Sequence, residues 1–287
     1  MKRNHIAFFV LLTILVLCPL PAASRQQPAS QSAGLPFSTP EQIKEDINAV
    51  TCKDKERLNS VKILFEKMGV PAADITVEKI KGVENVVVRK AGKSSDEKII
   101  IGAHYDKTGD GSCGAVDNWT GVVAVANIYK TLKDINLNKT ILFVAFGKEE
   151  KGLLGSKAMA SRIKKDTVMQ YCAMINIDSL GLSVPQILTN VSSKKLEAVA
   201  ADLAKKMTLP YQPITIHNAS SDSASFMEKK IPAATVSGIP DDWMEIFHSK
   251  NDQVKKINIT SVYLGYRLAL AMLVTIDEKE CGAYREK

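Results

Sequence analysis

The stretch KIIIGAHYD, residues 98–106, decides the fold class, because it has the pattern of a strand that is covered on both faces. A continuous apolar run follows Lys98 and ends at the polar residues His104 and Asp106. Two later stretches repeat this pattern, KTILFVAFGKEE at residues 139–150 and CAMINIDSLG at residues 172–181. Strands of this kind occur in parallel sheets that lie between layers of helices, so the sequence predicts an α/β protein.

Helical patterns alternate with strand patterns along the rest of the chain. Apolar residues at three- and four-residue spacing predict helices, with a break in the first near Thr51 and Cys52. The predicted helices cover residues 39–68, 117–135, 153–163, 193–207 and 258–278, and further strands are expected at 75–80, 85–92, 186–189 and 231–239. We therefore expect a single domain with a mostly parallel central sheet flanked by helices.

The N-terminal residues have the pattern of a signal peptide. Lys2 and Arg3 precede an apolar run over residues 6–20, and small residues suited to cleavage follow up to Ser24. An uncleaved anchor and lipidation at Cys18 are the alternatives, although the run is short for a membrane span. We expect a signal peptide at 1–24, a polar linker at 25–37 and the domain at 38–287. The protein is then exported to the periplasm or the medium, without a stable membrane partner.

Charge and cysteine content narrow the possible partners and the compartment. The formal net charge is +7, but the basic residues are interleaved with acids, and no basic patch with interspersed aromatic residues is present, so we expect no nucleic-acid partner. Cys52, Cys113, Cys172 and Cys281 remain after signal cleavage, and an oxidising compartment allows them to pair. Four cysteines allow three pairings, and the sequence does not choose among them.

Polar residues gather where the buried strands end. In open α/β sheets ligands bind beyond the carboxyl ends of the strands, so these side chains are expected to meet. Several carboxylates and two imidazoles in one cleft would repel and desolvate one another without a compensating cation, although each residue alone could be a cap or a solvated charge. The residues are His104, Asp106, Asp117, Glu149, Glu150, Asp178 and His248.

The adjacent residues Glu149 and Glu150 could have two different roles in one site. Adjacent residues of a regular strand point to opposite faces, so both can enter one site only if the chain bends, and Gly152 makes a bend easy. A metal hydrolase needs one carboxylate to hold metal and another to take a proton from the attacking water. Neighbouring glutamates at a bend could divide these tasks.

Five segments together resemble the M28 family of co-catalytic zinc aminopeptidases. They are GAHYD, GAVDN, EEKGLLGS, INIDSLG and FHSKND, in this order over residues 40–280. The resemblance implies a zinc exopeptidase-like fold and two divalent metal ions, expected to be Zn²⁺. It further implies that His104 and Asp178 hold one ion, that Glu150 and His248 hold the other, and that Asp117 bridges both.

The same resemblance implies the catalytic roles. Glu149 is expected to be the general base that passes a proton from a metal-bridging water to the leaving amine, and Asp106 to orient His104. Asp252 is a weaker candidate for supporting His248. The implied function is hydrolysis of N-terminal residues from peptides by a secreted, monomeric enzyme.

The family pattern is incomplete at one position, and three other functions stay open. Ser223 stands where many relatives carry a histidine, which leaves the expected metal ligands intact but puts contacts with substrate in doubt. The first alternative is a glutaminyl-peptide cyclotransferase-like acyltransferase with one zinc ion. The others are a non-catalytic binding module, which predicts lost ligands, and a carboxypeptidase, for which Lys107 could hold the terminal carboxylate.

Overall fold

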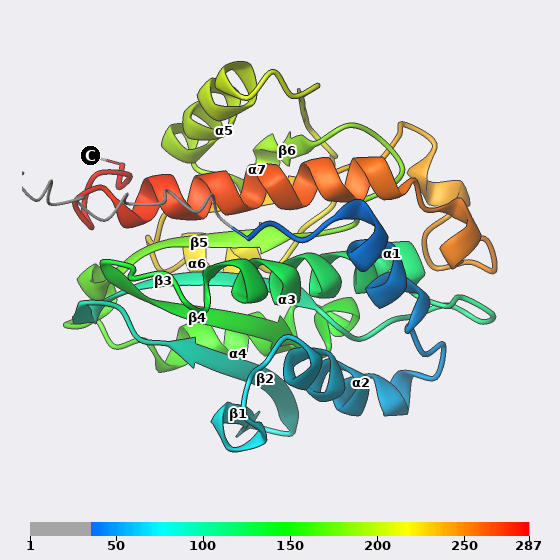
Figure 1. Ribbon diagram of the computed structural model, residues 1–287, viewed down its shortest axis with the longest axis horizontal. Coiled ribbons are helices and arrows are strands. Elements are labelled where there is room, and N and C mark those ends of the chain that lie inside the picture. The colour runs from blue at the N-terminus through cyan, green and yellow to red at the C-terminus, as the bar shows by residue number, and fades with distance from the viewer. Residues whose placement is uncertain (1–35, 287) are drawn as a thin grey trace, which may run out of the picture. The chain divides into compact units, whose positions relative to one another are not determined.

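A mixed sheet of eight strands runs through the part of the chain that this computed structural model describes, residues 36–286 (Figure 1). The strand order is β1-β2-β4-β3-β5-β8-β6-β7. The strands are β1 Ile75–Ile80, β2 Val83–Lys90, β3 Ser94–His104, β4 Lys139–Phe146, β5 Tyr171–Ile177, β6 Gln186–Leu188, β7 Gln212–Ile214 and β8 Ala233–Ser237. The predicted signal peptide, and all of the predicted linker except its last two residues, lie outside the described residues.

The centre of the sheet is parallel, as the sequence predicts. Strands β4, β3, β5 and β8 are neighbours that run parallel to one another. Strands β1 and β2 form an antiparallel hairpin whose second strand pairs with β4, and β6 pairs antiparallel with β8. The parallel centre brings the carboxyl ends of β3, β4 and β5 to the same edge of the sheet.

Helices cover both faces of the sheet (Figure 1). Side chains of α1, α2, α3, α5 and α7 join one apolar cluster, and side chains of α4 and α6 join a second. The helices are α1 Pro40–Asn48, α2 Asp54–Lys67, α3 Thr120–Leu132, α4 Leu154–Arg162, α5 Lys194–Lys206, α6 Ser223–Met227 and α7 Ile259–Asp277.

The two clusters explain the continuous apolar runs of the strands. In β3, Ile99 and Ile101 belong to the first cluster, whereas Ile100 between them belongs to the second. In β4, Phe143 belongs to the first cluster and its neighbour Val144 to the second. Successive side chains of a strand point to opposite faces, and here both faces are buried, so no polar alternation is required.

Helix α7 is a core helix, although it is long and apolar. The helix has 19 residues, and an 18-residue stretch of it has a mean hydropathy of 1.6, which by length and composition is enough to cross a membrane; among the described helices α7 alone has this property. Half of that apolar stretch is buried, including Leu268, Met272 and Leu273, which belong to the first apolar cluster. Core packing therefore accounts for its composition.

The helix predicted from Asp117 begins later than expected. Helix α3 starts at Thr120, and Asp117 and Asn118 have non-helical backbone angles (φ −110° and −139°), with a cis peptide bond between them. Asp117 therefore lies in a turn before the helix and does not act as its cap. The predicted break in the first helical region is confirmed, since α1 ends at Asn48 and α2 begins at Asp54.

All four described cysteines are paired. Cys52 is bonded to Cys113, which joins the segment between α1 and α2 to the loop that precedes Asp117. Cys172, in β5, is bonded to Cys281 in the C-terminal segment. The structure thus selects one of the three pairings that the sequence left open.

Candidate metal centre

The polar residues predicted from the sequence lie together at the carboxyl edge of the parallel strands. His104 is the last residue of β3, and Asp178 directly follows β5. Glu149 and Glu150 begin a short 3₁₀ turn just beyond β4. Asp117 and His248 reach the same place from loops that follow β3 and β8.

Two groups of potential metal ligands share Asp117. The ligand atoms of His104, Asp117 and Asp178 lie within 4.8 Å of one another, and so do those of Asp117, Glu150 and His248. The His104 Nε2 atom is 3.1 Å from Asp117 Oδ1 and 3.5 Å from Asp178 Oδ1. The His248 Nε2 atom is 3.3 Å from Asp117 Oδ2 and 2.9 Å from Glu150 Oε2. The two oxygens of Asp117 therefore face different histidines.

The donor set fits divalent cations. His104 Nδ1 lies 3.2 Å from the carbonyl oxygen of Asp106, a contact that requires this nitrogen to carry a proton. In a neutral imidazole Nε2 then presents a lone pair, which would face the oxygens of Asp117 and Asp178 unless a cation lies between them. The buried Glu150 Oε1 atom has no hydrogen-bond partner among the described residues, so it can also serve as a ligand.

Charge–charge interactions in the centre are strong when no cation is bound. Burial lowers the pKa of His104, but Glu149, Asp106 and the other nearby carboxylates outweigh it and raise this pKa well above its ordinary value. Hydrogen bonds with Asp117 and Glu150 raise the pKa of His248 to about 10. Burial raises the pKa of Asp117, but the two histidines outweigh it and lower this pKa overall. Metal binding at this site must therefore displace protons from the histidines.

The turn that carries Asp117 is fixed from outside the sheet. The carboxylate of Asp252 accepts hydrogen bonds from Val116 N at 2.6 Å and from Asp117 N at 3.4 Å. The buried guanidinium of Arg57 donates to the carbonyl oxygens of Cys113 and Gly114, each at 2.8 Å. The suggestion that Asp252 supports His248 is therefore corrected, because this carboxylate holds the Asp117 turn.

Asn118 and Trp119 anchor the same turn to the core. Asn118 donates to the carbonyl oxygen of Ile177 at 2.9 Å and accepts from Ser179 N at 2.9 Å. Trp119 is buried, and its indole N–H donates to Asp46 O at 3.1 Å. Both side chains therefore have structural contacts.

Asp106 connects His104 to the two glutamates. Its carbonyl oxygen faces His104 Nδ1, while its carboxylate accepts from Glu149 N at 2.9 Å and from Glu150 N at 3.3 Å. The bend expected near Gly152 is present, since this glycine has φ +95° and Lys148 on the other side has φ +57°. Asp106 thus positions both the histidine and the turn that delivers the glutamates.

Glu149 also lies in the centre, and its carboxylate forms no ion pair with a described residue. Burial raises its pKa to about 9, and the charges of Asp222, Asp178 and Asp117 act in the same direction, although His104 opposes them. This carboxylate therefore has a strong affinity for a proton when no metal is present.

Three residues around the centre were not singled out from the sequence. The Ser179 hydroxyl lies 3.3 Å from Asp117 Oδ1 and 3.0 Å from Asp178 Oδ1, and the Ser221 hydroxyl donates to Asp178 Oδ2. Asp222 has no exposed surface, and neither of its carboxylate oxygens makes a hydrogen bond to a described residue. Burial raises its pKa to about 7. Ser179 could have been suspected because it directly follows Asp178 in the sequence. Ser221 and Asp222 belong to no periodic pattern, so no such signal pointed to them.

Ser223 is part of the core. Its hydroxyl donates to the carbonyl oxygen of Val191 at 2.8 Å and lies 2.7 Å from the hydroxyl of Thr235. The residue is fully buried, so this serine does not form a wall of an open substrate cleft.

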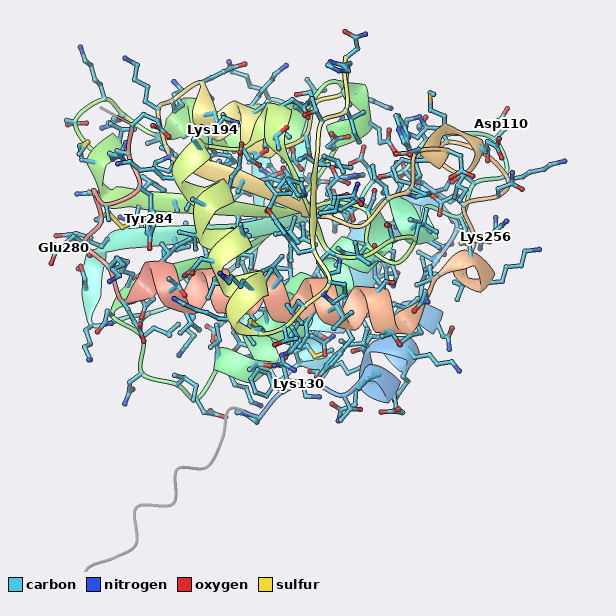
Figure 2. All side chains as sticks on the ribbon, turned by 90° about the horizontal axis from the view of Figure 1, so that it is seen from above. Asp110, Lys130, Lys194, Lys256, Glu280 and Tyr284 are labelled. Carbon is cyan, nitrogen blue, oxygen red and sulfur yellow. A yellow bond between two sulfur atoms is a disulfide. The ribbon has the colours of Figure 1, made fainter. Side chains whose placement is uncertain are left out.

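In space, the candidate metal centre and the C-terminal segment lie at opposite ends of the domain. Figure 2 shows Asp110 and Lys256 at one end and Glu280 and Tyr284 at the other, with α7 between them. The loop around Asp110 belongs to the metal-centre end, because the neighbouring Gly109 packs against the backbone of His248.

Comparison with known proteins identifies the class of this fold and site. The family model of peptidase family M28 matches residues 85–272, so the chain belongs to this family. The resemblance found in the sequence is thereby confirmed.

Individual relatives are distant. The chain is 24% identical over 212 residues to leucine aminopeptidase 2 of Trichophyton equinum, an alignment that covers 64% of this chain and 42% of that protein. The chain thus spans less than half the length of this relative.

Solved structures share the fold. A zinc aminopeptidase from Bacillus subtilis is similar with a TM-score of 0.61 and 23% identity, over 71% of this chain and 53% of that one. The glutaminyl cyclase of an Acidobacteriales bacterium is similar with a TM-score of 0.75 and 16% identity, over 88% of this chain and 100% of that one.

Proposed function

We propose that this protein is a metal-dependent aminopeptidase that removes N-terminal residues from peptides. The observation that carries the proposal is the pair of ligand groups that share Asp117, with Glu149 beside them and not part of either group. Membership of peptidase family M28 and the likeness to a leucine aminopeptidase support the same reaction class.

In this proposal the chain holds two Zn²⁺ ions. His104 and Asp178 bind one ion, Glu150 and His248 bind the other, and Asp117 binds both. Mixed imidazole and carboxylate donors suit zinc, and the likeness to a zinc aminopeptidase supports this choice. The ions, when bound, polarise the scissile carbonyl group and increase the acidity of water.

The protein side chains move the proton and keep the centre rigid. Glu149 accepts the proton of the attacking water and delivers it to the nitrogen of the leaving amine, while the peptide carbon–nitrogen bond breaks. Asp106 holds Glu149 in place through its backbone N–H. The proposed reaction needs no side-chain nucleophile. The hydroxyl of Ser179, which lies beside the centre, instead contacts the carboxylates of Asp117 and Asp178.

The loop before His248 is the proposed binding surface for the first side chain of the substrate. Trp243 and Phe247 pack edge to face with their ring centroids 5.2 Å apart, and Met244 between them is 71% exposed. These residues offer an apolar surface close to His248. Asp241 and Asp242 are exposed on the same loop and are proposed partners for the free α-amino group of the substrate.

A glutaminyl-peptide cyclotransferase is the second candidate, because the chain matches the full length of a glutaminyl cyclase structure. In that reaction the α-amine of an N-terminal glutamine attacks its own side-chain amide, and ammonia leaves. The ligand groups favour the aminopeptidase, since their five residues, with Asp117 shared, provide three ligands for each of two ions.

An activity assay separates these candidates. The zinc-loaded chain is given a panel of aminoacyl-p-nitroanilides and a peptide that begins with glutamine, beside Glu149→Gln and, as a control at an exposed position, Glu66→Gln. We expect release of apolar N-terminal residues by the wild type and by Glu66→Gln, and a loss of about 10²–10⁴-fold in kcat for Glu149→Gln. Cyclisation of the glutamine peptide without release of amino acids would replace the first proposal by the second.

We further propose that the protein is exported and acts as a monomer. The apolar run at residues 6–20 motivates export, and the two disulfide bonds support an oxidising compartment. Mass spectrometry of the N-terminus of the protein recovered from its host tests cleavage after Ser24.

A further inference from the structure

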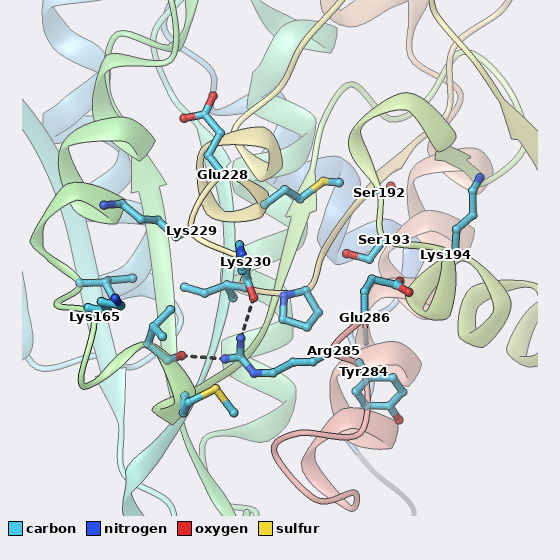
Figure 3. Close-up of a pocket in the computed structure, with 16 residues that line it drawn as sticks. Lys165, Ser192, Ser193, Lys194, Glu228, Lys229, Lys230, Tyr284, Arg285 and Glu286 are labelled. Atoms are coloured by element: carbon cyan, nitrogen blue, oxygen red, sulfur yellow. Dashed lines mark hydrogen bonds between the residues drawn. The ribbon is translucent and has the colours of Figure 1, made fainter.

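A cavity of about 1160 Å³ lies far from the metal centre (Figure 3). Its lining includes Val168 and Met169, which precede β5, and Pro232, which precedes β8. It therefore opens at the amino ends of these strands, whereas the metal centre lies at their carboxyl ends. Strand β5 has 7 residues, so the two sites are separated by roughly 20 Å.

The walls of this cavity are fixed to one another. The guanidinium of Arg285 donates to the carbonyl oxygens of Lys230 at 2.6 Å and Val168 at 2.7 Å, as the dashed lines in Figure 3 show. The disulfide bond between Cys172 and Cys281 ties the C-terminal wall to β5. These links hold the walls of the cavity in fixed positions, which suits a binding site, since such sites are usually largely preformed.

Part of the lining is apolar. Ile163 and Ile231 are buried at its base, and Met227 lies beside them. Met169 is 57% exposed and adds apolar surface to the lining. An apolar group of a ligand could bury this surface.

The remaining lining has an excess of three positive charges. Among the described residues, the ammonium groups of Lys165, Lys229 and Lys230 form no hydrogen bond or ion pair, so they are available to a ligand. Figure 3 shows Lys165 and Lys194 on opposite sides of the cavity, and the ammonium of Lys194 is paired with Glu197 at 3.1 Å. The charged lining residues are Lys165, Lys194, Lys229, Lys230 and Arg285, with Glu228 and Glu286 as the acids.

We propose that this cavity binds an acidic segment of a partner polypeptide that also carries apolar side chains. The three lysines that have no partner among the described residues, Lys165, Lys229 and Lys230, match several separated carboxylates better than one phosphate or one fatty-acid carboxylate. Tyr284 supplies the aromatic ring of the lining, but it is buried and cannot stack on a base, which disfavours single-stranded nucleic acid. The site is separate from the metal centre, so its occupant leaves that centre open.

Fluorescence anisotropy with a labelled peptide tests the proposal. The probe is an N-acetylated peptide of about ten residues in which Glu alternates with Leu and Phe, because acetylation blocks removal of its first residue. A second probe has Lys in place of Glu. Two double variants of the intact chain are compared, K165E/K229E in the cavity and K205E/K206E at the exposed end of α5 remote from Lys194.

The acidic probe is expected to bind saturably and the basic probe not at all. K165E/K229E should weaken binding about tenfold, since two attractive charges become repulsive, while K205E/K206E leaves it within about twofold. Met169→Asp should also weaken binding through loss of apolar contact. Hydrolysis of a small aminoacyl substrate should be the same in all variants.

Three results would overturn the proposal. The first is the absence of saturable binding by the acidic probe. The second is equal weakening by both double variants, which indicates general attraction to a basic surface. The third is displacement of the probe by laurate or by a thymidine oligonucleotide at lower concentration than by the unlabelled peptide, which assigns the cavity to lipid or nucleic acid.

Discussion

Replacement of Asp106 by asparagine should damage the metal centre although Asp106 is not one of the proposed metal ligands. The carboxylate accepts from Glu149 N at 2.9 Å and from Glu150 N at 3.3 Å. An asparagine side chain of the same shape has one oxygen that accepts and one amide that donates. In Asp106→Asn one of the two backbone N–H groups must therefore face another donor.

The size of the effect follows from these contacts. A hydrogen bond to a charged group contributes about 1.5–3 kcal/mol, so losing one should lower the free energy of unfolding by about 2 kcal/mol. The turn that carries Glu149 and Glu150 should also shift. Outer contacts of metal ligands typically change metal affinity or activity by about 10–100-fold, and we expect a loss of this size in zinc affinity and in kcat/KM.

Three measurements on Asp106→Asn test this reasoning. Urea unfolding gives the stability of the metal-free protein, competition with a chelating dye gives the zinc affinity, and an aminoacyl-p-nitroanilide gives kcat/KM. Asp110→Asn is the matched control, because Asp110 is exposed on the same loop and its carboxylate makes no hydrogen bond to a described residue. Zinc affinity and kcat/KM within about twofold of the wild type would refute the positioning role of Asp106.

Three further perturbations have expected outcomes. Replacing Cys52 and Cys113 by alanine removes a link across 61 residues, which should lower the free energy of unfolding in urea by about 4 kcal/mol. The same change should weaken zinc binding, and an unchanged zinc affinity would contradict this second effect. The pKa of Asp222 is raised from 3.8 to about 7, so the folded protein keeps this proton where the unfolded chain has lost it, and stability should fall as pH rises between these values. In the metal-free protein, Asp222→Asn should reduce this loss of stability with rising pH. The same pH dependence of the unfolding free energy in the wild type and in Asp222→Asn would refute this. The raised pKa values of His104 and His248 mean that zinc binding at pH 7 should release protons, which calorimetry in buffers of different ionisation enthalpy measures; no release would contradict the protonated histidines.

Much of the sheet could be predicted because its central strands are buried on both faces. The run Ile99–Ile101 indicates a strand wherever it lies in the sequence, and the helices between such runs indicate parallel pairing. The order of the strands could not be predicted, since it depends on which faces pack together. The short strand β7, Gln212–Ile214, has too few residues for a recognisable alternation.

The candidate metal centre was only partly predictable. Residues at strand ends, such as His104 and Glu150, were found because parallel strands bring their carboxyl ends together. Asp117 looked like a helix cap in the local sequence, and its place between two histidines depends on a turn held by Asp252, 135 residues later in the chain. Asp222 gave no signal, because it packs against the centre from another loop and lacks any periodic context.

Zinc content per chain is the most direct test of the shared carboxylate. The intact chain and Asp117→Ala are equilibrated with zinc, freed of excess by dialysis and analysed by inductively coupled plasma mass spectrometry, with circular dichroism to establish that both are folded. We predict two ions per chain for the wild type, and loss of both zinc and aminopeptidase activity for Asp117→Ala. A folded Asp117→Ala protein that keeps two ions, or a wild type that binds one, would contradict a centre built around Asp117.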